Sequence, residues 1–126
     1  MATLRNVSSP YRTSGSDIDL ELWLSATLFE IVVAVLDTLG VGGYKRSKTY
    51  RLSCGKVELF LIDASAPDEV TLALQHNLRT MRGWDAVVAA QYLAQKSLIA
   101  HLTGTDRKHA KAQLAVAFGL NPIVYG

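Results

Sequence analysis

The chain has 126 residues, of which 49% are hydrophobic, and it carries 13 lysines and arginines against 11 aspartates and glutamates. This length fits one domain, and this hydrophobic content is sufficient for a packed core without additional staples. A single cysteine, Cys54, excludes an internal disulfide and is typical of a reducing, intracellular setting. Because the formal net charge is only +2, the positions of the charges are more informative than their number.

The first 16 residues are polar, and Pro10 opposes a helix there. They predict an extended basic arm that carries Arg5 and Arg12. The arm lacks the apolar central run of a signal peptide, so we expect a protein that is not secreted by that route.

Residues 17–39 predict a long first helix with acidic residues in its first turn. Apolar residues cover most of the helix circumference, so we expect neighbouring helices or another subunit to cover several of its sides. The stretch Leu20–Leu39 has roughly the length of a membrane span. Glu30 would then lie near the bilayer centre at a high cost, which favours burial within protein instead. Gly40 ends the helix.

Residues 47–62 predict a β-hairpin, because apolar residues alternate onto one face and charged residues onto the other. A two-residue turn at Cys54 and Gly55 would place Arg51 opposite Glu58. The hairpin and the residues just before it concentrate positive charge. These cations are Lys45, Arg46, Lys48, Arg51 and Lys56.

The rest of the chain predicts three helices. Ser65–Glu69 combines a capping serine, an early proline and acidic residues, which is a typical helix start. Apolar residues then repeat at helical spacing as far as Met81, and Gly83 marks a break. The two later helices are predicted at Trp84–Leu102 and Arg107–Phe118, with an extended tail after them.

These elements predict an α+β fold class that is mainly α-helical, in which a helical bundle has one β-hairpin inserted after the first long helix. The predicted domain organisation is an extended basic arm at residues 1–16 and a single helical domain at residues 17–126. The hairpin at residues 47–62 lies inside that domain.

No residue pattern identifies a reaction. Residues 40–46 have the glycines and cations of a phosphate loop, but a helix precedes them and a strand follows, which reverses the order of a P-loop. Glu58 matches an acidic residue in the strands of some nucleases, whereas Phe60 stands where those nucleases carry a lysine. The three histidines and Cys54 lack the spacing of a zinc site. We therefore expect no catalytic residues, no metal and no cofactor.

Positive charge also gathers on the predicted helices, where Arg79 and Arg82 share one face and further cations begin the last helix. We predict that the cations contact phosphates without sequence preference, and that Tyr44, Tyr50 and Phe60 offer stacking surfaces. A solvated edge whose lysines prevent aggregation is the alternative interpretation of the hairpin charges. The predicted nucleic-acid-binding residues are Arg5, Arg12, Lys45, Arg46, Lys48, Arg51, Lys56, Arg79, Arg82, Arg107, Lys108 and Lys111.

The leading hypothesis is a non-enzymatic structural subunit that binds and packages DNA or RNA in a repeating assembly with copies of itself or of a related subunit. In general character, a short, Ala/Leu-rich, mostly helical chain with a basic arm resembles the coat proteins of filamentous archaeal viruses. That resemblance implies a place in a virion, with the cytoplasm as the alternative location. Two other functions stay open: a small subunit of a CRISPR ribonucleoprotein surveillance complex, and an inactive or small nuclease-like enzyme. None of them requires a membrane partner.

Overall fold

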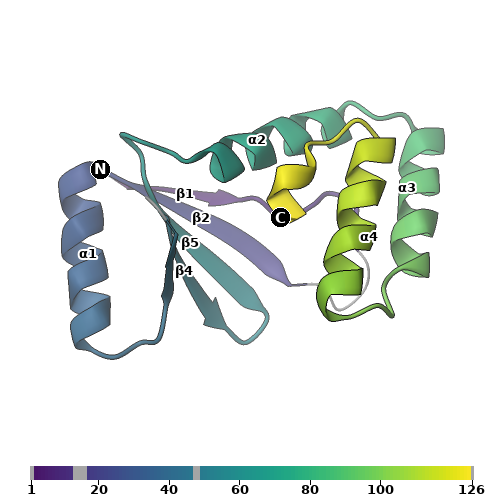
Figure 1. Cartoon of the computed structure of the whole chain (residues 1–126). Helices are drawn as coiled ribbons and strands as arrows, with labels where there is room; N and C mark the ends of the chain where they lie inside the picture. The colour runs from purple at the N-terminus through teal and green to yellow at the C-terminus, as the bar shows by residue number, and fades with distance from the viewer. Residues whose placement is uncertain (1, 13–16, 47–48, 126) are drawn as a thin grey trace. The chain divides into compact units, whose positions relative to one another are not determined.

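The computed structural model describes residues 2–12, 17–46 and 49–125, without the side chain of Arg46 (Figure 1). Its contacts divide the chain into two compact units. We call residues 1–8 and 16–68 the sheet unit, and residues 9–15 and 69–126 the helical unit. The chain therefore enters the helical unit once near its start and returns to it at residue 69.

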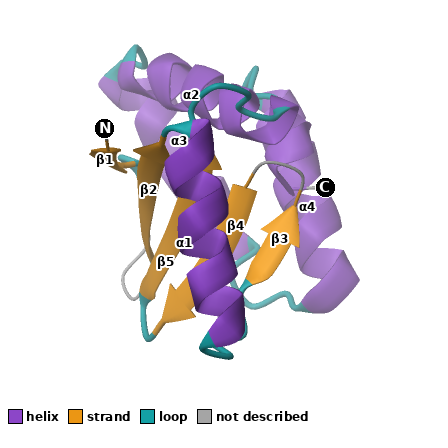
Figure 2. Cartoon of the chain, turned by 90° about the vertical axis from the view of Figure 1, so that its left-hand side faces the viewer, coloured by secondary structure: helices purple, strands orange, loops and turns teal. Residues whose placement is uncertain are grey.

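The sheet unit contains a mixed sheet of five strands within the described residues, in the order β1-β2-β5-β4-β3. Strands β2 and β5 run parallel, and every other neighbouring pair is antiparallel. One helix, α1 (Ala26–Thr38), follows β2 and lies against one face of the sheet (Figure 2). The strands are β1 (Ala2–Asn6), β2 (Ile18–Leu24), β3 (Tyr44–Arg46), β4 (Thr49–Cys54) and β5 (Val57–Asp63).

The predicted fold class is wrong, because a five-stranded mixed sheet replaces the single hairpin in a helical bundle. The error began at residues 17–39, which form a strand followed by a shorter helix. Polar Asp19 and Glu21 alternate with apolar residues along β2, which is the period of a half-buried strand. The segment predicted as an extended arm supplies β1, which pairs with β2 through residues 2–6.

The two faces of the sheet differ in chemistry. Leu24, Tyr50 and Leu61 point to the face that α1 covers, where they pack with Phe29 and Val33 in the core. Because successive strand residues alternate between faces, the residues between them point to the opposite face, which carries charged and aromatic side chains. Burial of the apolar face gives the sheet unit its stability.

Helix α1 has a clear signal at each end. Ser25 accepts a hydrogen bond from the Leu28 amide at its start. At its end, the Val41 amide donates to the Leu36 carbonyl at 3.2 Å and the Gly40 amide donates to Asp37 at 3.1 Å, which is a Schellman motif. The predicted stop at Gly40 is confirmed.

Among the described residues, none of the helices has both the length and the apolar character needed to cross a membrane.

The hairpin is present as β4 and β5, but its register is two residues away from the predicted one. Cys54 pairs with Val57, so Gly55 and Lys56 form the turn. Arg51 therefore lies opposite Phe60 and diagonal to Glu58, not opposite Glu58 as predicted. A shift of two preserves the side-chain alternation, so the residues of β4 and β5 still lie on the faces that the sequence predicted.

The helical unit is built from three α-helices and a final 3-10 turn within the described residues. The predicted helix start before residue 69 is confirmed, whereas the tail forms a 3-10 turn rather than an extended segment. The buried Asn77 side chain donates a hydrogen bond to the Asn121 carbonyl and accepts one from the Asn121 amide. These two bonds hold the tail against the second helix. The elements are α2 (Glu69–Arg82), α3 (Ala86–Leu98), α4 (Gly104–Ala117) and η1 (Pro122–Tyr125).

An aromatic cluster forms a second packing centre, in the helical unit. Trp84 lies within 5.0 Å of the Tyr92 ring and 5.7 Å of the Phe118 ring, measured between centroids. Tyr11 comes from residues 9–12 of the helical unit, which we call the early segment, and it stacks on Trp84 at 5.7 Å with an angle of 17° between the rings. Lys96 also donates to the Tyr11 carbonyl at 3.2 Å. The early segment is thus fixed by the chain's own aromatic residues.

Candidate nucleic-acid interface

The predicted cations divide between the two units. Lys48 and the side chain of Arg46 lie outside the described part of the structure. The sheet unit holds Arg5, Lys45, Arg46, Arg51 and Lys56. The helical unit holds Arg12, Arg79, Arg82, Arg107, Lys108 and Lys111.

A row of aligned side chains crosses the sheet on the face away from α1. Tyr44 pairs with Arg51, Arg51 with Phe60, Phe60 with Glu21, and Glu21 with Arg5. The row thus joins one residue from each of the five strands in the described sheet. We call these five residues the transverse row. It places two arginines and two aromatic rings on one face of the sheet, with the buried Glu21 between Phe60 and Arg5.

Arg51, which lies next to Tyr44 in the transverse row, is held in a defined position. Its Nε donates to Glu58 Oε2 at 2.6 Å, and its guanidinium lies 5.8 Å from the centre of the Phe60 ring. This hydrogen bond is the main cause that lowers the pKa of Glu58 below its ordinary value of 4.5. The Arg51 side chain is still 52% exposed, so the ion pair orients it without burying it.

Arg5 occupies the other end of the transverse row. Its guanidinium lies 5.0 Å from the centre of the Trp23 ring, and Trp23 Nε1 donates to Glu21 Oε1 at 2.9 Å. Burial raises the pKa of Glu21 above its ordinary 4.5, against the lowering effects of the Trp23 hydrogen bond and the Arg5 charge. Glu21 itself is 2% exposed, so it offers little contact area between Arg5 and Phe60.

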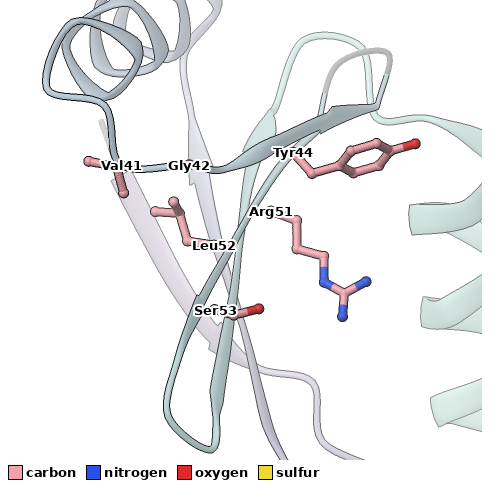
Figure 3. Close-up of a pocket in the computed structure, with 6 residues that line it drawn as sticks. All are labelled: Val41, Gly42, Tyr44, Arg51, Leu52 and Ser53. Carbon is pink, nitrogen blue, oxygen red and sulfur yellow. The ribbon is translucent and has the colours of Figure 1, made fainter.

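A hollow of about 280 Å3 opens at the edge of the sheet, beside β3 and β4 (Figure 3). Tyr44, Arg51 and Ser53 point to one side of the strand pair, whereas Leu52 points to the other. The hollow is lined by Val41, Gly42, Tyr44, Arg51, Leu52 and Ser53.

The hollow exists because β3 is short. Its pairing with β4 covers Tyr44 to Arg46, so β4 continues without it at Leu52 and Ser53. The chain enters β3 through Gly43, whose backbone passes directly over the Tyr50 ring. A side chain at Gly43 would overlap Tyr50 Cε1, Cζ and Oη. The glycines predicted as a helix stop therefore also shape this edge.

Some predicted contacts have other roles. Tyr50, expected to stack on bases, is 2% exposed and belongs to the core, where its hydroxyl donates to Asp37 at 3.2 Å. Lys45 pairs with Tyr50 and therefore lies on the α1 side of the sheet, away from the transverse row. Arg107 Nη1 donates to the Ala100 carbonyl at 3.3 Å, and Lys111 Nζ lies 5.9 Å from the Tyr125 ring centre.

Two acidic residues at and beyond the end of β5 have structural partners. Asp63, buried at the end of β5, accepts bonds from the amide and hydroxyl of Ser65. Asp68 accepts a bond from Thr49 at 3.4 Å. Within residues 2–12, 17–46 and 49–125, no three His, Cys, Asp or Glu side chains are grouped to hold a metal ion.

Sequence reasoning missed Trp23 and Glu21. The alternation in Ile18–Leu24 could have found both, because it assigns Glu21 and Trp23 to the polar face of a strand. The pairing of β1 with β2 has no comparable signal, since Ala2–Asn6 is short and polar.

No protein-family model, no curated protein and no solved structure matches this chain.

Proposed function

We propose that this protein is a non-enzymatic subunit that binds nucleic acid in a repeating assembly. The observation that carries the proposal is the transverse row, which aligns Tyr44, Arg51, Phe60 and Arg5 on one face of the sheet. Arginines neutralise phosphates, and aromatic rings on a flat sheet offer stacking surfaces to bases.

The balance of charge on this face favours weak, salt-dependent binding. Glu58 and Asp19 lie on the same face as the two arginines, and Glu58 already pairs with Arg51. Arg51 keeps half of its side chain exposed, so it can still contact a phosphate. None of these contacts distinguishes one base sequence from another, so the binding is nonspecific.

The assembly part of the proposal rests on α1. Its outward side exposes Ile31, Val35 and Leu39, which are 55%, 51% and 71% exposed and recur at every fourth residue. An apolar stripe of this kind is unusual on a solitary protein and suits contact with another subunit. The resemblance to filamentous virus coats loses its basis, because the five-stranded sheet departs from their chiefly helical character.

Fluorescence anisotropy with a labelled single-stranded 12-mer, repeated at several salt concentrations, tests nucleic-acid binding. The doubly substituted R5Q/R51Q variant should bind more weakly, with a salt slope smaller by about 0.7 for each lost phosphate contact. The matched control is R82Q/K108Q, which removes the same charge from exposed positions of the helical unit. An equal loss in both variants would refute the transverse row as the interface, and no binding at all would refute the function.

A further inference from the structure

We propose that the hollow beside β3 and β4 holds one unpaired nucleotide, with its base stacked on Tyr44 and its phosphate on Arg51. This inference rests on the proposed function and specifies it, because it makes the preferred partner a single strand. The hollow lies at one end of the transverse row, where Tyr44 and Arg51 are register partners on neighbouring strands.

Tyr44 is suited to stacking. Its side chain is 64% exposed, and in Figure 3 its ring extends from the strand on the same side as the Arg51 guanidinium. Neighbouring strands are about 4.8 Å apart, so a base on the Tyr44 ring would have its phosphate within reach of Arg51. Stacking on an aromatic ring is available to every base, which fits a contact without sequence preference.

Arg51 is suited to the phosphate. Its hydrogen bond to Glu58 uses Nε, and the guanidinium has further N–H donors in a fixed planar fork. A phosphate can accept two such donors at once. Because Glu58 and the Phe60 ring already orient the side chain, little conformational freedom is lost on binding.

The remaining walls limit what the hollow can accept. Ser53 lies on the same side as Tyr44 and Arg51 and offers a hydroxyl to the sugar or phosphate, whereas Leu52 lines the hollow from the other side of the strand pair (Figure 3). A volume of about 280 Å3 is close to the lower limit of small-molecule sites, roughly 300 Å3, so one nucleotide is the largest unit expected. In a duplex the bases are stacked and paired, so only an unpaired base can reach the Tyr44 ring.

The test uses NMR amide spectra of the full chain with adenosine 5′-monophosphate, adenosine or inorganic phosphate at equal concentrations. The nucleotide should shift the amide signals of Tyr44, Arg51 and Ser53 more than either fragment does. Y44L should weaken nucleotide binding about fivefold or more, whereas Y44F, which keeps the ring, should bind like the native chain. Since Tyr44 is exposed, both variants should keep the native circular dichroism spectrum.

The same variants, tested with the single-stranded 12-mer and with its duplex, separate this inference from the proposed function. Y44L should weaken single-strand binding and leave duplex binding unchanged. If the single strand binds the native chain and Y44L equally well, the hollow is not a nucleotide site, although the function stands. If no oligonucleotide binds any variant, the function fails, and nucleotide shifts at the hollow would then support only a mononucleotide site.

Discussion

Gly43 is the residue whose substitution should most directly damage the sheet unit. Replacing Gly43 by Ala places a Cβ on the Tyr50 ring, against Cε1, Cζ and Oη. The ring cannot move aside easily, because Tyr50 is 2% exposed in the core and its hydroxyl is bound to Asp37. Overpacking of this kind costs about 1–3 kcal/mol. We expect the midpoint of thermal unfolding to fall by roughly 4–8 °C for each kcal/mol in a unit of this size.

Two further variants make this prediction specific. G42A places its methyl group in open space at φ +76°, so it should cost only the roughly 1–2 kcal/mol of a left-handed residue. Y50L removes the ring that the new Cβ would strike, so G43A should cost much less in a Y50L background than in the native chain. If the effects of G43A and Y50L on the free energy of unfolding simply add, the overlap is not the cause. A G43A protein as stable as the native chain would refute the reasoning.

Three further predictions follow from the charged and apolar surfaces. E21Q should raise the free energy of unfolding at pH 7, because the raised pKa of Glu21 means that its ionised form opposes folding. Denaturant curves should show this gain in stability at pH 7 and its loss below pH 4.5, whereas a less stable E21Q protein at pH 7 would contradict the prediction. E58Q should cost only about 0.2–1 kcal/mol, since the pair is partly exposed. It should also tighten oligonucleotide binding, because it removes a negative charge that repels phosphates while the glutamine oxygen can still accept from Arg51; weaker binding by anisotropy would argue against the candidate interface. V35K should lower the mass of any oligomer measured by light scattering, whereas L72K, at an equally exposed apolar site on α2, should not; equal effects would remove α1 as the contact.

The sequence predicted those elements whose signals are local. The hairpin, the helix from residue 69 and the stop at Gly40 each depend on neighbouring residues, and all three are present. The sequence analysis missed strand β2, because β2 and the apolar run after it together resembled one continuous helix. A strand and a helix share Leu20–Leu39, with Ser25 as the boundary, and a capping serine is a weaker signal than a long apolar run.

The candidate interface could be predicted only in part, for a related reason. Arg51 and Phe60 were found because both lie on the hairpin. Their alignment with Glu21 and Arg5 depends on pairing between strands that are distant in sequence, and single-sequence patterns do not specify such pairing. Tyr50 was misassigned because an aromatic residue next to cations looks the same whether it faces solvent or the core.

The early segment has a consequence for how the molecule must be made. Lys96 contacts Tyr11 across 85 positions of the chain, and the Tyr11 ring completes the cluster around Trp84. A ribosome therefore synthesises the first part of the helical unit, residues 9–12, before strands β2 to β5 and long before the helices from residue 69 on. Contacts between residues this far apart in the sequence form more slowly than local ones. A chain truncated to residues 69–126 would lack Tyr11, so the side of the Trp84 ring on which Tyr11 stacks would be left uncovered.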